Sequence, residues 1–302
     1  MLLLILLAVR IHEFQVKYEP RTSLFRKVDL TGYSFALVGD STLCSLHVNN
    51  DKDSIWNKFE SITKKKCFPG AVSGITNVDF INAARRIAMK MPAYSTVFID
   101  VLPHRFIMNR RSEKGKYDAQ FADVLKQEQS VIWNWLYYLK LDYVTELKHI
   151  LRGKKTDRDG DNYNRVWNID GNVAREKYEA FIRGFNKGLA PVDDLIVEEV
   201  KPFINEISSI FLGAKIKPVF IIMPLNKTEI YSYSDKIQAD IIYNTLKEIK
   251  VRIEMHLGDR NLLYMDLFEA VPDKCFADLL HTNTCGDEIL VKNLADFSIK
   301  DY

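Results

Sequence analysis

The stretch FALVGDSTLCSL, Phe35 to Leu46, decides how the fold of this chain is interpreted. Its opening run, Phe35–Val38, is apolar without a helical gap, which predicts a short buried strand. The residues that follow, Gly39–Thr42, are typical of a turn and a helix cap. Because open α/β sheets place their sites at the carboxyl ends of strands, Ser41 is a candidate nucleophile, with helix capping as the simpler interpretation.

The composition indicates a globular protein long enough for one large domain or two modest ones. The chain has 302 residues, of which 47% are hydrophobic and 27% charged, and its net charge is +2. This small net charge argues against a nucleic-acid-binding protein, which would carry a basic face. The basic clusters Lys64–Lys66 and Arg152–Lys155 are short and are interpreted as solvated loop ends.

The N-terminus is apolar from Met1 to Val9 and then meets Arg10. A spanning helix needs about 20 apolar residues, and a complete signal peptide has a basic start and a small-residue cleavage site. The end of a membrane anchor, a degenerate export signal and a buried N-terminal element all remain possible interpretations. The leucine-rich composition favours an anchor or signal remnant with a linker over residues 1–30.

Alternating strand and helix patterns predict a mainly parallel sheet with helices on both faces. Short apolar or β-branched runs predict strands at 34–38, 96–102, 218–223 and 262–266. Helical patterns cover 77–90, 118–152, 175–188, 192–212 and 234–257. The section from about 106 to 200 has no good strand, so we expect a helical insertion or lid there. Its aromatic stretch, Trp133–Val144, is typical of a core but would also suit a groove or a lipid surface.

A second informative stretch, FADLLHTNTCGDEIL, places Asp278 and His281 in an Asp-x-x-His pattern ahead of a helix. On an irregular turn, a carboxylate at this spacing can reach the Nδ1 side of the imidazole and leave the other nitrogen facing outward. An imidazole held in this way is the base that a serine hydroxyl needs to act as a nucleophile. By itself, however, the pattern is more commonly a surface pair.

Gly-Asp-Ser after the first core strand and Asp-x-x-His before the last helix together resemble the SGNH (GDSL) hydrolase superfamily, in the family order of serine, acid and histidine. The resemblance implies a three-layer, flavodoxin-like α/β sandwich over residues 31–302, with the helical insertion at about 106–200. It also implies that Ser41 attacks an ester carbonyl, His281 moves the proton and Asp278 orients the imidazole. No metal or organic cofactor is expected for this chemistry.

The stretch FPGAVSGIT, Phe68 to Thr76, is similar to the second block of that family, in which a glycine N–H helps to form the oxyanion hole. The preferred alignment makes this glycine Gly74, and a shifted register makes it Gly70. The backbone N–H of Ser41 would be the other donor. Turn geometry is the simpler interpretation of both glycines.

The third family block departs from the pattern. The family has Gly-x-Asn-Asp after its next core strand, whereas here TVFIDVL runs into PHRF and Arg105 stands at roughly the asparagine's place. A guanidinium can donate to an oxyanion or hold an anionic substrate group, and a structural ion pair is the alternative. The neighbouring His104 is a weaker candidate.

The C-terminal third of the chain looks like envelope-associated members of the superfamily. The resemblance is carried by the stretch from Lys217 to Asp235, the long helix after it, the run LLYMDLF and the Asp-x-x-His turn. Those members include the teichoic-acid D-alanyl transfer protein and alginate-type O-acetylation proteins. The resemblance implies a membrane-anchored, extracytoplasmic protein acting on acyl esters of an envelope polysaccharide, with a membrane-bound O-acyltransferase as a possible partner. The alternatives are an inactive SGNH-like binding module and a soluble, cytoplasmic small-ester hydrolase.

The four cysteines, Cys44, Cys67, Cys275 and Cys285, form no C-x-x-C pair, so a zinc site is not expected. Their number fits two disulfides in an oxidising compartment or four buried thiols in a reducing one. Cys275 and Cys285 bracket the Asp-x-x-His turn. For an exported chain we therefore hypothesise a disulfide between these two residues that clamps the turn.

Overall fold

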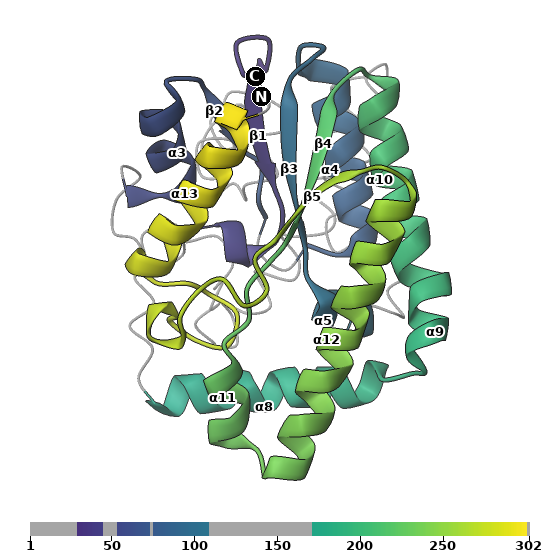
Figure 1. The fold of residues 1–302 in the computed structure, drawn as a ribbon, viewed down its shortest axis with the longest axis vertical. Coiled ribbons are helices and arrows are strands. Elements are labelled where there is room, and N and C mark those ends of the chain that lie inside the picture. Colours follow the sequence, from purple (N-terminus) through teal and green to yellow (C-terminus); the bar gives the residue numbers. More distant parts are fainter. Residues whose placement is uncertain (1–28, 45–52, 73–74, 109–170, 301–302) are drawn as a thin grey trace, which may run out of the picture.

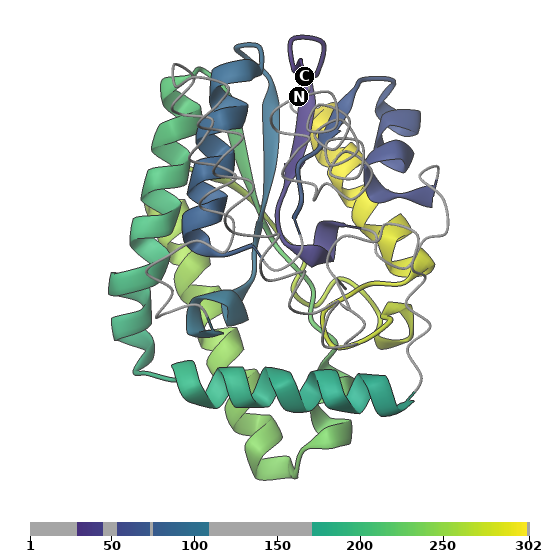
Figure 2. The same cartoon turned by 180° about the vertical axis from the view of Figure 1, so that it is seen from behind.

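The computed structural model describes residues 29–44, 53–72, 75–108 and 171–300. Within these ranges, one sheet has the strand order β2-β1-β3-β4-β5, and every neighbouring pair is parallel. The strands are β1 (Phe35–Val38), β2 (Cys67–Pro69), β3 (Thr96–Val101), β4 (Lys217–Ile222) and β5 (Leu263–Asp266). Helices cover both faces of the sheet (Figures 1 and 2), so the predicted three-layer α/β architecture is confirmed.

The side chains of β1 show how the sheet divides the core. Ala36 and Val38 belong to one apolar cluster with helices α4 (Asn77–Lys90), α10 (Lys201–Gly213) and α12 (Lys236–Asp259). Phe35 and Leu37 belong to a second cluster with α3 (Ile55–Thr63) and α13 (Thr284–Lys300). Since successive residues of a strand point to opposite faces, a strand covered on both sides has to be apolar throughout. The uninterrupted run FALV follows from this double burial.

Strand β2, helix α3 and helix α11 (Lys227–Tyr233) are among the described elements that the sequence patterns did not predict. Strand β2 is short and contains Pro69, and it lies at the sheet edge, where proline is tolerated. Helix α3 begins at its N-cap Ser54, whose side chain accepts a hydrogen bond from the backbone N–H of Asn57. The helix predicted at 77–90 is confirmed as α4 and starts with a capping box between Thr76 and Asp79.

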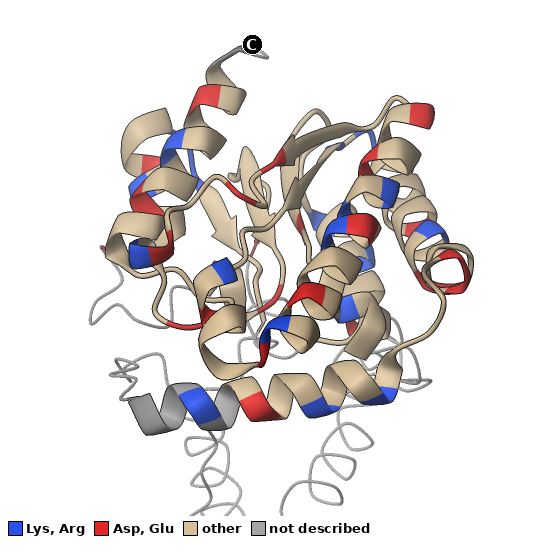
Figure 3. Ribbon diagram, turned by 60° about the horizontal axis from the view of Figure 1, so that its bottom comes forward, with Lys and Arg blue, Asp and Glu red and all other residues tan. Residues whose placement is uncertain are grey.

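The described part of the predicted insertion is helical. It contains the end of α5 (Pro103–Met108), then α8 (Gly171–Gly188), α9 (Val192–Leu195) and the π-helical turn η4 (Ile196–Val200). Figures 1 and 3 show α8 lying across the end of the molecule toward which the strands run, with residues of both charge signs along it. The helical pattern at 118–152 and the aromatic stretch at 133–144 lie outside the described residues.

No helix in the described ranges combines the length and apolar composition that a membrane span requires. The anchor or signal remnant predicted for residues 1–30 falls almost entirely on residues 1–28, which lie outside the described part of the chain.

Candidate active site

Ser41 starts the short 3-10 helix η2 (Ser41–Leu43), directly after the turn that ends β1. The N-cap of this helix is Asp40, whose side chain accepts a hydrogen bond from the backbone N–H of Ser41, with an N···Oδ1 distance of 2.6 Å. Capping is therefore done by the residue before Ser41. The Ser41 side chain is half-buried, and its hydroxyl contacts a partner from another part of the chain.

The loop that carries His281 is closed on itself ahead of α13. Phe276 and Thr282 form an isolated antiparallel bridge, and the backbone N–H of Ala277 donates to the carbonyl of His281 at 2.7 Å. Cys275 and Cys285 form a disulfide with a Cα–Cα distance of 5.3 Å. The hypothesised bridge is thus present, and it joins the start of the loop to the first turn of α13.

Ser41, His281 and Asp278 form a continuous hydrogen-bonded chain. The Oγ of Ser41 lies 2.9 Å from Nε2 of His281, and Nδ1 of His281 lies 2.8 Å from both carboxylate oxygens of Asp278. The backbone N–H groups of Leu280 and His281 also donate to Oδ1 of Asp278, at 2.9 and 2.8 Å. Because the carboxylate can only accept, it fixes the proton on Nδ1 and leaves Nε2 to accept the serine hydroxyl.

The hydrogen-bond partners of Asp278 stabilise the negative charge of its carboxylate. Burial raises the pKa of this carboxyl, but the positive charge and ring N–H of His281, together with the two backbone N–H donors, outweigh burial and hold the pKa below its usual range. Asp278 is therefore ionised at neutral pH. Glu229 lies nearby in α11 (Lys227–Tyr233), and both its own burial and the negative charge of Asp278 raise its pKa.

Of the two glycines proposed as oxyanion donors, Gly74 and Gly70, only Gly70 is among the described residues. Val72, two positions before Gly74, donates its N–H to the carbonyl of Gly39 at 2.8 Å, so Val72 lies against the turn that carries Ser41. The N–H of Gly70 instead donates to the carbonyl of Phe68 at 3.0 Å. A Cβ on Gly70 would lie 3.0 Å from the carbonyl oxygen of Leu37. Gly70 therefore packs closely beside β1, and in this structure its N–H is already hydrogen-bonded to Phe68.

Arg105 is buried and forms the structural ion pair that was the alternative to a contact with the oxyanion or the substrate. Its side chain is 1% exposed and forms an ion pair with Asp100, with an Nη1···Oδ1 distance of 2.9 Å. The guanidinium also lies over the rings of Phe80 and Phe203, with 4.8 and 5.3 Å to their centroids. His104 is buried too, and burial, followed by the charges of Arg105 and His281, lowers its pKa to about 3.

Asp100 is the residue of this region that the sequence analysis missed. Its Oδ2 accepts the backbone N–H of Asp40 at 2.6 Å and the hydroxyl of Thr42 at 3.1 Å, so it contacts the residues on either side of Ser41. The available signal was a charged residue inside the otherwise apolar strand TVFIDV. Aspartate is rarely fully buried without a partner, so this position had to have one.

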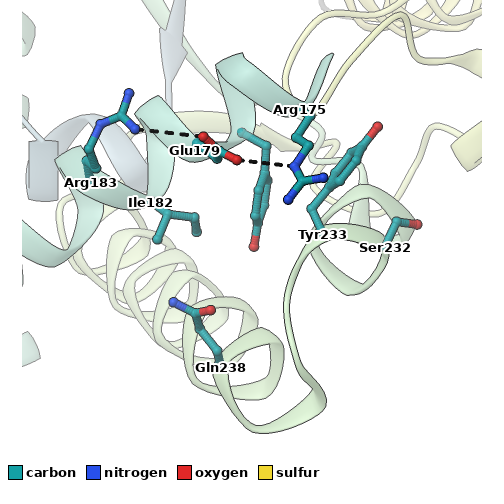
Figure 4. A pocket seen from close by; sticks show the side chains of 8 residues that line it. Arg175, Glu179, Ile182, Arg183, Ser232, Tyr233 and Gln238 are labelled. Carbon is teal, nitrogen blue, oxygen red and sulfur yellow. Dashed lines mark hydrogen bonds and ion pairs between the residues drawn. The ribbon is translucent and has the colours of Figure 1, made fainter. Parts of the chain in front are cut away.

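A separate open pocket of about 490 Å³ lies between α8, α11 and α12 (Figure 4). Its lining is rich in hydrogen-bond donors and consists of Arg175, Tyr178, Glu179, Ile182, Arg183, Ser232, Tyr233 and Gln238. Figure 4 shows Glu179 between the two arginines, with ion-pair distances of 3.2 and 4.0 Å. One carboxylate is thus shared by two guanidinium groups, which leaves the pocket with an excess of positive charge.

Fold and site together define a parallel α/β sandwich in which a serine at the end of the first strand is joined to a histidine and an aspartate ahead of the last helix. No family model and no curated protein matches the chain. Among solved structures, 32 chains match.

The matched structures include several described as lipolytic proteins or esterases. A lipolytic protein of the G-D-S-L family from Veillonella parvula is 9% identical over 87% of this chain and 96% of that chain, with a TM-score of 0.43. The carbohydrate acetylesterase Est24 from Sinorhizobium meliloti is 9% identical, covers 89% and 100%, and has a TM-score of 0.44. An extracellular lipase from Streptomyces rimosus is 12% identical, covers 87% and 99%, and has a TM-score of 0.44. At these identities and TM-scores, the chemistry of this chain has to be judged from its own residues.

Proposed function

We propose that this protein is an SGNH-type serine esterase or O-acyltransferase that works through an acyl-enzyme. The observation that carries the proposal is the 2.9 Å contact between Oγ of Ser41 and Nε2 of His281, continued to Asp278. A serine hydroxyl is a weak nucleophile unless a positioned base takes its proton, and this chain supplies the base and the group that orients it.

In the proposed reaction, Oγ of Ser41 attacks the ester carbonyl while Nε2 of His281 takes the hydroxyl proton. The tetrahedral intermediate collapses, the ester C–O bond breaks, and His281 returns the proton to the leaving alkoxide. Water or an acceptor hydroxyl then attacks the acyl-enzyme and loses its proton to His281. The bond between the acyl carbon and Oγ breaks, and His281 returns the proton to Oγ of Ser41. Asp278 stabilises the imidazolium formed in each half of the reaction.

Oxyanion stabilisation places a further demand on the site. The backbone N–H of Ser41 donates to Oδ1 of Asp40 in this structure, so an oxyanion has to replace that contact or share the donor. We propose the N–H of Gly74 as the second donor, and the hydrogen bond from Val72, two positions before it, to the carbonyl of Gly39 supports this. Each such donor lowers the barrier by about 3 kcal/mol in serine hydrolases.

We further propose an esterified envelope polysaccharide as the substrate, an extracytoplasmic location and a membrane-bound O-acyltransferase as the partner. The sequence resemblance to envelope-associated members supports these assignments, and so does the Cys275–Cys285 disulfide, since disulfides persist in oxidising compartments. The donor-rich pocket at α8 offers a place for part of an extended, anionic chain.

Fluorophosphonate labelling combined with a panel of acyl esters tests the chemistry. The Ser41 oxygen should displace fluoride from phosphorus and form a stable adduct, and Ser41→Ala and His281→Ala should both abolish labelling and turnover. An adduct that persists in Ser41→Ala would put the nucleophile elsewhere. No adduct and no turnover in the folded wild type, together with measurable glycan binding, would favour the inactive binding module.

A further inference from the structure

The carboxylate of Asp100 lies directly behind the turn that carries Ser41. Strands β1 and β3 pair in register, with Val38 opposite Ile99, so the residue after Ile99 lies beside the end of β1. Asp100 is 0% exposed, and its Oδ2 accepts the N–H of Asp40 and the hydroxyl of Thr42. One buried oxygen thus binds the residue before Ser41 and the residue after it.

Gly39 allows this close approach. A Cβ on Gly39 would lie 2.4 Å from Oδ2 of Asp100 and 2.9 Å from Cδ1 of Leu43. Neither atom has room to retreat, because Asp100 is held by its own partners and Leu43 is buried. A glycine at the end of β1 therefore lets the carboxylate reach the turn.

Arg105 holds Asp100 from the opposite side. Nη1 donates to Oδ1 at 2.9 Å, and Nη2 donates to the backbone carbonyl oxygen of the same aspartate at 2.7 Å. The other charged group facing the carboxylate is Asp40, which is repulsive. A buried ion pair contributes little net stability compared with an apolar pair of similar volume, since both charges lose their hydration. Stability alone therefore does not explain why strand β3 carries a buried aspartate that is paired with Arg105 in α5.

We propose that Asp100, held by Arg105, is a positioning residue for the candidate nucleophile. Its carboxylate fixes the turn Gly39–Thr42 in the conformation that directs the hydroxyl of Ser41 at Nε2 of His281. This assignment rests on the proposed function, and it gives Arg105 an indirect role in place of the substrate contact predicted from the sequence.

The kinetic test compares four variants of the full chain by fluorophosphonate labelling. Asp100→Asn should lower the maximal labelling rate by about 100-fold, as expected for a displaced nucleophile, with little change in the half-saturating probe concentration. Thr42→Val removes only one of the two contacts and should lower the rate roughly tenfold. Arg105→Gln should resemble Asp100→Asn, and Arg105→Lys should restore part of the rate because it keeps the charge.

The pH profile separates this role from a purely structural one. Burial raises the pKa of Asp100 and Arg105 lowers it, so loss of the guanidinium should allow the carboxyl to protonate at higher pH. The acidic limb of the labelling profile should therefore move to higher pH in Arg105→Gln and not in Arg105→Lys. Ile207→Val, at a buried core position of α10, is the control for general loss of stability and should label at the wild-type rate.

Nuclear magnetic resonance gives a readout that does not depend on activity. The amide proton of Asp40 should resonate downfield and exchange slowly in the wild type, and Asp100→Asn should remove both properties. Asp100→Asn should also shift the ring resonances of His281 toward those of Ser41→Ala. If the wild type does not label, the proposed function fails while these spectra still test the positioning role. Wild-type labelling in Asp100→Asn, or unchanged Asp40 and His281 signals, would overturn the positioning role itself.

Discussion

The carboxylate of Asp278 accepts hydrogen bonds from both the ring Nδ1 and the backbone N–H of His281, at 2.8 Å each. The same oxygen therefore fixes the tautomer of the imidazole and the main chain that carries it. The imidazole side chain is 15% exposed, so its outer edge remains close to solvent while its inner edge is held. A base in this position can exchange protons with a substrate without changing its orientation.

Asp278→Asn tests the orientation of the base. The amide keeps the shape of the carboxylate but can present a donor to Nδ1, which favours the wrong tautomer. We expect turnover of a small acyl ester to fall by about 10³- to 10⁴-fold, with little change in KM. Asp296→Asn, on the exposed side of α13, is the control and should leave kcat and KM at wild-type values. Equal kcat values for the two variants would contradict this role for Asp278.

The stability of the protein should also depend on Asp278 as the pH falls. Its pKa is lower in the folded chain than in the unfolded chain, so the folded state binds fewer protons. The resulting stabilisation is complete above the unfolded-state pKa of about 4 and is lost as the pH falls through the folded-state value. Denaturant unfolding should show that the difference in free energy of unfolding between wild type and Asp278→Asn shrinks below about pH 4. If the difference in free energy of unfolding grew as the pH fell, the lowered pKa of Asp278 in the folded chain would be contradicted.

The disulfide between Cys275 and Cys285 should support the loop that holds Asp278 and His281. The bridge closes a short loop, with a sequence separation of 10. Replacing both cysteines with serine should lower the free energy of unfolding by about 2–3 kcal/mol and reduce the labelling rate. Reductant should have the same effects on the wild type and none on the double variant. If reductant changes neither property of the wild type, the bridge does not clamp the loop.

The pocket at α8 should contribute to the binding of extended substrates and not to the binding of small ones. Arg175→Ala and Arg183→Ala each remove one of the two positive charges that share the single negative charge of Glu179. We expect KM for an acetylated, carboxylated polysaccharide to rise by about threefold to tenfold, as for the loss of an exposed charge-assisted contact. KM for a small aryl acetate should stay unchanged. Arg85→Ala, whose partner Glu206 lies on α10, is the matched surface control. Equal effects on both substrates would remove the pocket from the proposed binding path.

Local sequence patterns were sufficient to predict the strands whose two faces are both buried, because that burial requires apolar residues throughout. Strands were predicted at 34–38 and 96–102, close to the observed β1 and β3, because these mostly apolar runs are covered on both faces in the core. Helix α4 was predicted at its observed bounds because its amphipathic pattern and its capping residues agree. Strand β2 was missed because it exists through its pairing with β1 and has no pattern of its own.

Arg105 shows where local patterns were insufficient. Its position after β3 suggested a substrate contact, but its environment is built by Phe80 on α4 and Phe203 on α10, and neither is a neighbour in sequence. The packing of Gly70 was likewise not visible in the sequence, since its partner Leu37 belongs to strand β1. The direction of a side chain at a strand end depends on which elements pack around it.

The types and the order of the candidate catalytic residues were readable along the chain, because a serine after a buried strand and an Asp-x-x-His turn are patterns of single segments. Their meeting in space was not readable there. Ser41 and His281 are separated by 240 positions and lie within hydrogen-bond distance, and the turn that carries Ser41 is bound by Asp100. Parallel pairing brings the ends of β1 and β3 to one edge of the sheet, and loops from distant parts of the chain meet at that edge.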